Sequence, residues 1–185
     1  MKFCFALFFL ICAAAFGQAP VAEDVPVKDT AAQAHISAAE EDQVLALLEE
    51  DTDGEWDRER ASELRYKRVS LSDAPNDGII VQSTSLDDCG ATGNCPIWVL
   101  RETKAAVQLV LGNAVGDAIG LQTEKEQGLK SILLSSNQSA ESNFVAVFVF
   151  DGEKYSQRSC YEEKLGQDGK RRALQPVNCN STSHP

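Results

Sequence analysis

Histidine is nearly absent from this chain of 185 residues, because His35 and His184 are its only two imidazoles. Neither lies in a segment whose pattern would hold a side chain in fixed geometry, so a histidine general base is not expected. The Gly-x-Ser-x-Gly elbow, the phosphate-binding loop, the dinucleotide fingerprint and the His-Glu-x-x-His motif are missing as well. We therefore expect a protein that is not an enzyme and that carries no cofactor.

Basic residues are also scarce, with 17 Lys and Arg against 28 Asp and Glu and a net charge of −11. A surface this acidic repels the phosphate backbone, which argues against a nucleic-acid partner. Thirteen of the acidic side chains fall in residues 18–60, together with only three basic ones. The acidity therefore belongs to the N-terminal part, and residues 61–185 are nearly neutral.

Long hydrophobic runs are missing except at the start, where Lys2 precedes an apolar stretch over residues 3–16. This stretch is shorter than the roughly 20 residues that span a bilayer, and it ends in small residues such as Ala15 and Gly17. That order predicts a signal peptide over residues 1–17. We expect the mature chain to be periplasmic or secreted, with no membrane insertion after cleavage.

The mature chain divides by composition into an N-terminal third and a β-rich remainder. Residues 18–36 lack periodicity and are predicted to be a disordered acidic linker. Residues 37–63 are predicted to hold a helix and an acidic turn. Ser37 and Glu40 fit a capping box there, and apolar residues between Val44 and Leu48 give one stripe. The helix is expected over residues 38–50.

Residues 64–161 read as short β-rich runs separated by turn residues. The runs cover residues 66–71, 79–84, 97–101, 106–111, 132–135, 143–150 and 154–160. Asp151-Gly152 predicts a hairpin, and Thr123-x-x-Glu126 predicts a brief helix that ends before Gly128. The expected fold is mainly β, a small antiparallel sheet or half-barrel with one N-terminal amphipathic helix and one short helix.

Of six cysteines, Cys89, Cys95, Cys160 and Cys179 remain after the predicted cleavage. An even number in an exported chain argues for disulfides, and three pairings are formally open. Proximity along the chain favours Cys89 with Cys95 and Cys160 with Cys179, which would tie a C-terminal tail, residues 162–185, back to the last strand. The spacing is wrong for a zinc site, because the close pair is separated by five residues.

Acidic side chains offer two weaker interpretations. Glu102, Asp117, Glu124 and Glu126 are candidates for a carboxylate-dependent hydrolase, although nothing in the sequence selects a pair. Residues 49–60 match the start of a calcium-binding EF-hand loop, but Arg60 occupies the position of the final bidentate Glu. We therefore expect no metal site there.

The Cys-x-x-x-Gly-Asn-Cys arrangement at residues 89–95, together with residues 80–82, 96–101 and 150–155, resembles uncharacterised secreted bacterial proteins. Residues 73–78 are weakly similar to the Asp-rich loop of FG-GAP or VCBS-type extracellular β modules. The first resemblance covers residues 64–161 and implies no known activity. It draws attention to a disulfide-closed loop with Thr92, Gly93, Asn94 and the following Trp98 as a candidate partner-binding loop, or as a plain structural staple.

Three functions remain open at this point. The leading hypothesis is an exported, non-catalytic β-domain that binds an unknown protein or glycan partner in the bacterial envelope or outside the cell. The alternatives are an inhibitor of an exported hydrolase such as lysozyme, and a carboxylate-dependent hydrolase. Two N-glycosylation sequons, Asn137-Gln138-Ser139 and Asn180-Ser181-Thr182, matter only in a host that glycosylates exported chains.

Overall fold

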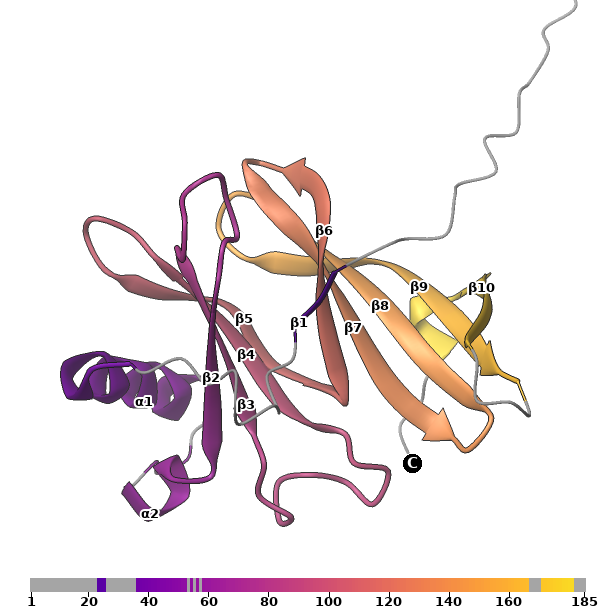
Figure 1. Ribbon diagram of the computed structural model, residues 1–185, viewed down its shortest axis with the longest axis horizontal. Helices are drawn as coiled ribbons and strands as arrows, with labels where there is room; N and C mark the ends of the chain where they lie inside the picture. The colour runs from indigo at the N-terminus through magenta and orange to yellow at the C-terminus, as the bar shows by residue number, and fades with distance from the viewer. Residues whose placement is uncertain are drawn as a thin grey trace, which may run out of the picture.

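Two antiparallel β-sheets and one covering helix make up the protein (Figure 1). The computed structural model describes residues 23–25, 36–52, 54, 56, 58–166 and 171–181. The N-terminal elements are β1 (Glu23–Val25), α1 (Ala38–Thr52) and α2 (Arg58–Ala61). The later elements are β2 (Leu64–Val69), β3 (Gly78–Ser83), β4 (Cys95–Glu102), β5 (Val107–Gly116), β6 (Ala118–Glu126), β7 (Leu129–Ser139), β8 (Ser142–Phe150), β9 (Tyr155–Leu165), β10 (Arg171–Val177) and the 3-10 turn η2 (Cys179–Ser181).

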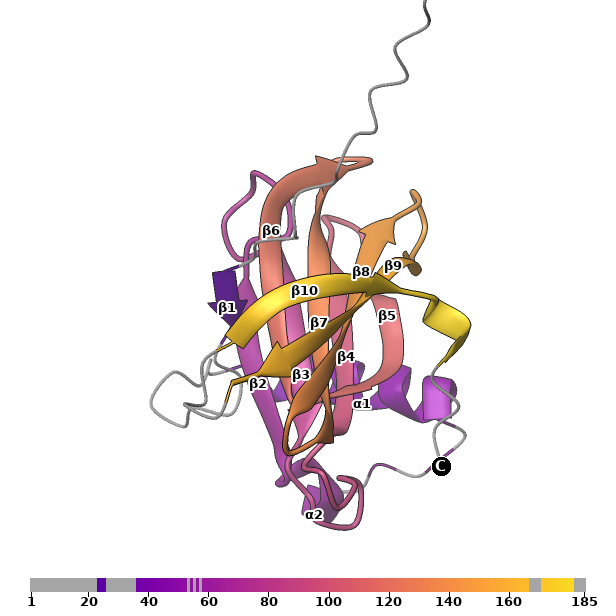
Figure 2. The same ribbon diagram turned by 90° about the vertical axis from the view of Figure 1, so that its right-hand side faces the viewer.

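Apart from β1, which pairs with β6, the strands of both sheets form meanders in which neighbours along the chain are also neighbours in space. One sheet has the order β2-β3-β4-β5, and the other has the order β1-β6-β7-β8-β9-β10. Short connections make antiparallel neighbours the natural outcome. The strands of the second sheet change direction progressively from β6 to β10, so this sheet is strongly twisted (Figure 2). The prediction of a mainly β, antiparallel fold with an N-terminal helix is confirmed.

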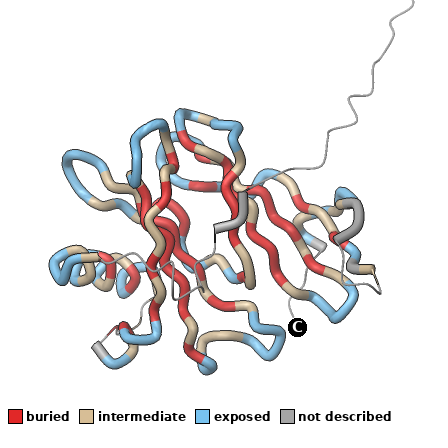
Figure 3. The backbone as a smooth tube through the Cα atoms, viewed as in Figure 1, coloured by how far each residue is buried: buried red, intermediate tan, exposed pale blue. Residues whose placement is uncertain are grey.

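The four-stranded sheet is buried on both of its faces, as the red strands of Figure 3 show. Along β4, Ile97 and Val99 point into a core shared with the six-stranded sheet, whereas Trp98 and Leu100 point toward α1. The alternation follows from the pleat, which sends successive side chains to opposite faces. Because both faces are covered, β3 carries the uninterrupted apolar run Ile79-Ile80-Val81.

Helix α1 starts at the predicted capping box. The Ser37 backbone N–H donates to Glu40 Oε2 at 2.7 Å, and the Glu40 N–H donates to Ser37 Oγ at 3.3 Å. Val44 and Leu48 form the apolar stripe and are completely buried against the four-stranded sheet. The hydrogen bonds from Ser37 hold the pKa of Glu40 below its usual value, helped by the Arg68 guanidinium.

The two sheets meet where β5 turns into β6. The Asp117 N–H donates to the Ser135 carbonyl at 2.8 Å, which ties this corner to β7. Gly116 lies against the same carbonyl, and a Cβ on Gly116 would stand 2.6 Å from that oxygen. A residue without a side chain is therefore required for the sheets to come this close.

The hairpin at Asp151-Gly152 is confirmed, with Gly152 at a φ of 113°. The Asp151 carboxylate accepts hydrogen bonds from the backbone N–H groups of Glu153 and Lys154, both at 2.9 Å. These bonds lower the pKa of Asp151 and show why Asp precedes Gly at this turn.

The helix predicted after Thr123 is wrong, because residues 118–126 form β6. Ile119 and Leu121 are buried in the core between the sheets, and this period-2 pattern outweighs the Thr-x-x-Glu signal. Gln127 and Gly128 both have positive φ, at 49° and 86°, and they make the tight turn into β7. The short helix of the structure is α2 instead.

Both predicted end segments contribute strands. Within residues 18–36, predicted to be disordered, Glu23–Val25 pairs with β6 as the edge strand β1. Within residues 162–185, predicted to be a tail, β9 continues to Leu165 and β10 adds a further strand. Cys179 is joined to Cys160 by a disulfide, as proposed from the spacing. The predicted signal peptide, His35 and His184 lie outside the described residues.

Replacing Gly116 by Ala should destabilise the fold, because its Cβ would collide with backbone at the junction of the sheets. We expect a loss of about 1–3 kcal/mol in the free energy of unfolding, measured by urea denaturation. Gly90→Ala is the matched control, since its Cβ meets nothing nearer than 3.8 Å and its φ is not positive. Equal stability of the two variants would contradict the close approach at Gly116.

The depressed pKa of Glu40 predicts a pH-dependent contribution to stability. Its ionised form is favoured in the folded state, so the contribution is present above the unfolded pKa and is lost as pH falls through the folded pKa. Glu40→Gln should cost about 0.5 kcal/mol at pH 7, and its deficit should shrink below about pH 4. Glu50→Gln, an exposed change in the same helix, is the control, and its free energy of unfolding should follow the pH dependence of the wild type. A deficit for Glu40→Gln that is independent of pH would refute this.

Candidate partner-binding surface

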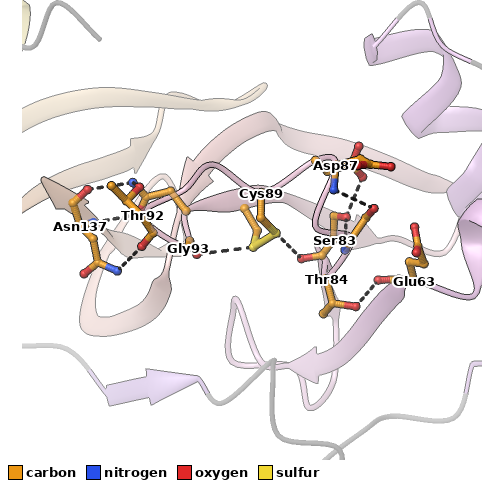
Figure 4. The surroundings of a disulfide bond; sticks show 12 residues. Glu63, Ser83, Thr84, Asp87, Cys89, Thr92, Gly93 and Asn137 are labelled. Carbon is orange, nitrogen blue, oxygen red and sulfur yellow. Dashed lines mark hydrogen bonds between the residues drawn. A yellow bond between two sulfur atoms is a disulfide. The ribbon is translucent and has the colours of Figure 1, made fainter. Parts of the chain in front are cut away.

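The connection from β3 to β4, residues 84–94, is closed by the predicted disulfide between Cys89 and Cys95 (Figure 4). Because Cys95 opens β4, the bond fixes the far end of the connection directly to the sheet. The bond divides the connection into two parts with different roles, residues 84–88 and residues 90–94.

The second part is docked onto the neighbouring sheet. Asn94 Nδ2 donates to the Asn137 carbonyl at 2.9 Å, and the Asn137 N–H donates back to Asn94 Oδ1 at 2.8 Å. Asn137 Nδ2 also donates to the Thr92 carbonyl at 3.0 Å (Figure 4). Gly93 has a φ of 78°, which gives this loop the positive-φ residue that it needs to turn. The polar groups of Asn94 are therefore used to hold the loop against β7.

Trp98, proposed above as part of a partner-binding loop, lies beneath α1 and is only 1% exposed. Its Nε1–H donates to Asp51 Oδ2 at 3.1 Å. The Trp56 ring meets it edge-on at 5.5 Å between centroids, and the Arg60 guanidinium stacks over Trp56 at 4.1 Å. A partner could reach this indole only if α1 left the sheet. Of the four proposed residues, the structure brings Thr92, Gly93 and Asn94 together near the surface and places Trp98 in the core.

The first part of the connection, residues 84–88, is a tightly braced turn. Thr84 donates to the Glu63 carbonyl through its N–H at 2.9 Å and its Oγ1 at 2.7 Å. The Cys89 N–H donates to the Ser85 carbonyl at 3.0 Å. The Asp88 carboxylate accepts from Ser83 Oγ at 2.7 Å and pairs with Arg60 at 3.0 Å.

Leu86 lies within this braced turn, and the residue is 91% exposed. Among the described residues, the one other large apolar side chain counted as exposed is Val115, at 44%. Three acidic side chains are also exposed. Glu59 lies in α2, Glu63 carries the carbonyl that accepts from Thr84, and Asp87 directly follows Leu86. Sequence reasoning missed Leu86, although an isolated Leu within a run of Ser, Thr and Asp was a readable signal.

The candidate catalytic carboxylates lie on different parts of the fold. Glu102 ends β4 and pairs with Arg68 at 2.9 Å. Asp117 lies at the corner between the sheets, whereas Glu124 and Glu126 lie near the other end of β6, and Glu126 pairs with Arg158. Nine residues of strand separate Asp117 from Glu126, roughly 30 Å, which is too far for an acid and base to share one glycosidic bond.

The acidic stretch considered for calcium, residues 49–60, and the Asp-rich loop at residues 73–78 both contribute contacts to the fold itself. Asp51 lies in α1, where it accepts the Trp98 indole N–H. The Asp77 carboxylate accepts the backbone N–H groups of Leu71 and Ser72 and so closes the β2–β3 connection. Asp73 pairs with Lys125, which lowers its pKa. In the parts of the chain that are described, no group of three or more His, Cys, Asp or Glu could hold a metal ion.

Comparisons with known proteins leave this geometry to be interpreted on its own. No protein-family model, no curated protein and no solved structure matches the chain. In the described portion, no helix is long and apolar enough to cross a membrane. The resemblance drawn from residues 89–95 therefore stays a prediction.

Removing the acceptor of the Trp98 indole should weaken the attachment of α1. We expect Asp51→Ala to lower the free energy of unfolding by about 1–3 kcal/mol, since a buried N–H loses its partner. Asp51→Asn, which keeps an acceptor oxygen, should lose less. Glu50→Ala, an exposed neighbour on the same helix, should change stability by less than about 0.5 kcal/mol. Urea denaturation followed by tryptophan fluorescence measures all three, and equal losses would contradict this role of Asp51.

Proposed function

We propose that the chain is an exported, non-catalytic β-domain that binds a protein partner through the braced turn at residues 84–88, with Leu86 as the anchor. The observation that carries this proposal is an aliphatic side chain, 91% exposed, on a turn whose backbone is already held in place. Burying a Leu side chain is worth about 1.5–3 kcal/mol. Because the turn is pre-organised, little of that gain is lost in ordering it.

Two covalent ties support the export part of the proposal. The disulfides Cys89–Cys95 and Cys160–Cys179 are consistent with a protein that folds outside the cytoplasm, since such bonds persist in oxidising compartments. The apolar stretch at residues 3–16 belongs to the predicted signal peptide, which would direct the chain out of the cytoplasm.

A protein partner fits the turn better than a glycan. Sugars are bound by convergent polar groups and flat aromatic faces, and the side chains of Trp56, Trp98, Tyr66 and Tyr155 are all buried. The exposed Leu86 is followed by the exposed Asp87, and the exposed Glu63 belongs to the segment that accepts the hydrogen bonds of Thr84, which matches a protein surface with an apolar pocket and a basic rim.

Inhibition of an exported hydrolase is a second candidate, favoured by the charge of α1. Glu49, Glu50 and Asp51 are exposed in its last turns, and that end of the helix holds no basic residue. Such a surface would steer the chain toward a cationic enzyme. The Ser85–Cys89 hydrogen bond closes Leu86 into a turn, so an inhibitor of this shape would plug a site rather than enter it as an extended substrate.

Site-specific photo-crosslinking tests the anchor. A benzoylphenylalanine at position 86, in the full chain mixed with native extracellular and envelope fractions, should give one discrete protein adduct. The same group at Lys104, in the exposed turn at the other end of β4, should give none. Excess wild-type chain should compete, and Leu86→Asp should compete at least tenfold more weakly, since a change of 1.4 kcal/mol is a factor of ten.

Leu86→Asp should fold normally, because the side chain makes no buried contact that could be lost. Equal adducts at positions 86 and 104, no adduct at either, or full competition by Leu86→Asp would each exclude the turn as the binding surface. Competition by soluble glycans instead of protein would favour a glycan partner.

A further inference from the structure

The two sequons of the chain lie in very different surroundings. Asn137 lies near the end of β7, where it is paired with Asn143 of β8. Asn180 lies in η2, beside the disulfide that joins Cys179 to Cys160. Sequence alone gives both the same standing as acceptors for an N-linked glycan.

The Asn137 side chain is committed to the fold. Its Nδ2 donates to the Thr92 carbonyl at 3.0 Å, and its backbone N–H donates to Asn94 Oδ1 at 2.8 Å. A glycan grows from Nδ2 itself, so it would replace one of the two hydrogens and push a sugar ring against the docked loop. A chain glycosylated at Asn137 would therefore have its bond from Nδ2 to the Thr92 carbonyl disturbed, which is one of the three hydrogen bonds that hold residues 90–94 to Asn137 of β7.

The Asn180 side chain is exposed, and the described structure gives its carboxamide no hydrogen bond. Its backbone N–H donates to Asn178 Oδ1 at 3.0 Å, which leaves Nδ2 uninvolved. Cys179 fixes the turn to β9, with the two Cα atoms of the disulfide 5.2 Å apart. A glycan on Asn180 would thus leave from an anchored turn without disturbing a strand.

We propose that Asn180 is the N-glycan acceptor of this protein in any secretory pathway that glycosylates, and that folded, exported chains carry no glycan on Asn137. In the transfer, Asn180 Nδ2 forms a bond to the anomeric carbon of a lipid-linked oligosaccharide. The bond from that carbon to the lipid diphosphate breaks, the diphosphate leaves, and the amide gives up one proton. This modification goes beyond the partner-binding turn and shares with it only the premise of export.

Expression of the full chain in cultured mammalian cells, with intact-mass measurement before and after peptide N-glycosidase F, tests the assignment. The folded, secreted protein should lose the mass of one glycan on treatment. Asn180→Gln and Thr182→Ala should both abolish that loss. Ser139→Ala is the matched control for the other sequon, because it removes the acceptor motif but keeps the Asn137 amide, and it should leave the loss unchanged.

Absence of any glycosidase-sensitive mass would overturn the proposal, whether the chain is secreted or retained. So would a loss abolished by Ser139→Ala and kept in Asn180→Gln, or secreted protein that carries two glycans. Peptide mapping after deglycosylation reads the site directly, since the released Asn becomes Asp.

Discussion

Burial of the four-stranded sheet on both faces is the constraint on which the other features depend. One face packs against the six-stranded sheet, and the other packs under α1, where Val44 and Leu48 are fully buried. A polar group at the centre of such a sheet costs free energy unless a partner is provided. The indole N–H of Trp98 has such a partner in Asp51 of the helix, whereas the buried Gln82 Nε2 on β3 has none. The helix is therefore held by a specific bond as well as by apolar contact.

The two disulfides reinforce places that this core does not reach. Cys89–Cys95 closes the β3–β4 connection beyond the end of the sheet, and Cys160–Cys179 joins η2 to β9 after the last strand. Both bonds shorten the loops of the unfolded chain, the second one over a sequence separation of 19 residues. Surface segments that would otherwise fray are thereby available as defined shapes, which is what presenting Leu86 or anchoring a glycan requires.

How far the sequence could predict the fold depended on whether the deciding contact was local. The capping box at Ser37, the turn at Asp151-Gly152 and the nearest-neighbour cysteine pairing are local, and all three are confirmed. The strand β6 was missed because Thr123 and Glu126 imitate a helix start, and only burial against the other sheet decides between the two.

The strand β1 shows the same limit in a different form. Three residues carry no pattern of their own, and Glu23–Val25 becomes a strand only because β6 offers an edge far along the chain. The candidate surface could likewise be predicted only in part from the sequence. The disulfide loop was found from its cysteines, but the burial of Trp98 and the exposure of Leu86 depend on where α1 lies and on how residues 84–88 turn.

Leu86 cannot account for a stable complex by itself. A dissociation constant near 1 μM needs about 8 kcal/mol, whereas one buried Leu supplies about 1.5–3 kcal/mol. The remainder has to come from the surface around the turn, which includes the exposed acids Glu63 and Asp87. Exposed charges add little affinity but raise association rates and select partners. A partner that binds here must therefore make further apolar contacts around Leu86. The acidic side chains act mainly by favouring a partner with a basic rim.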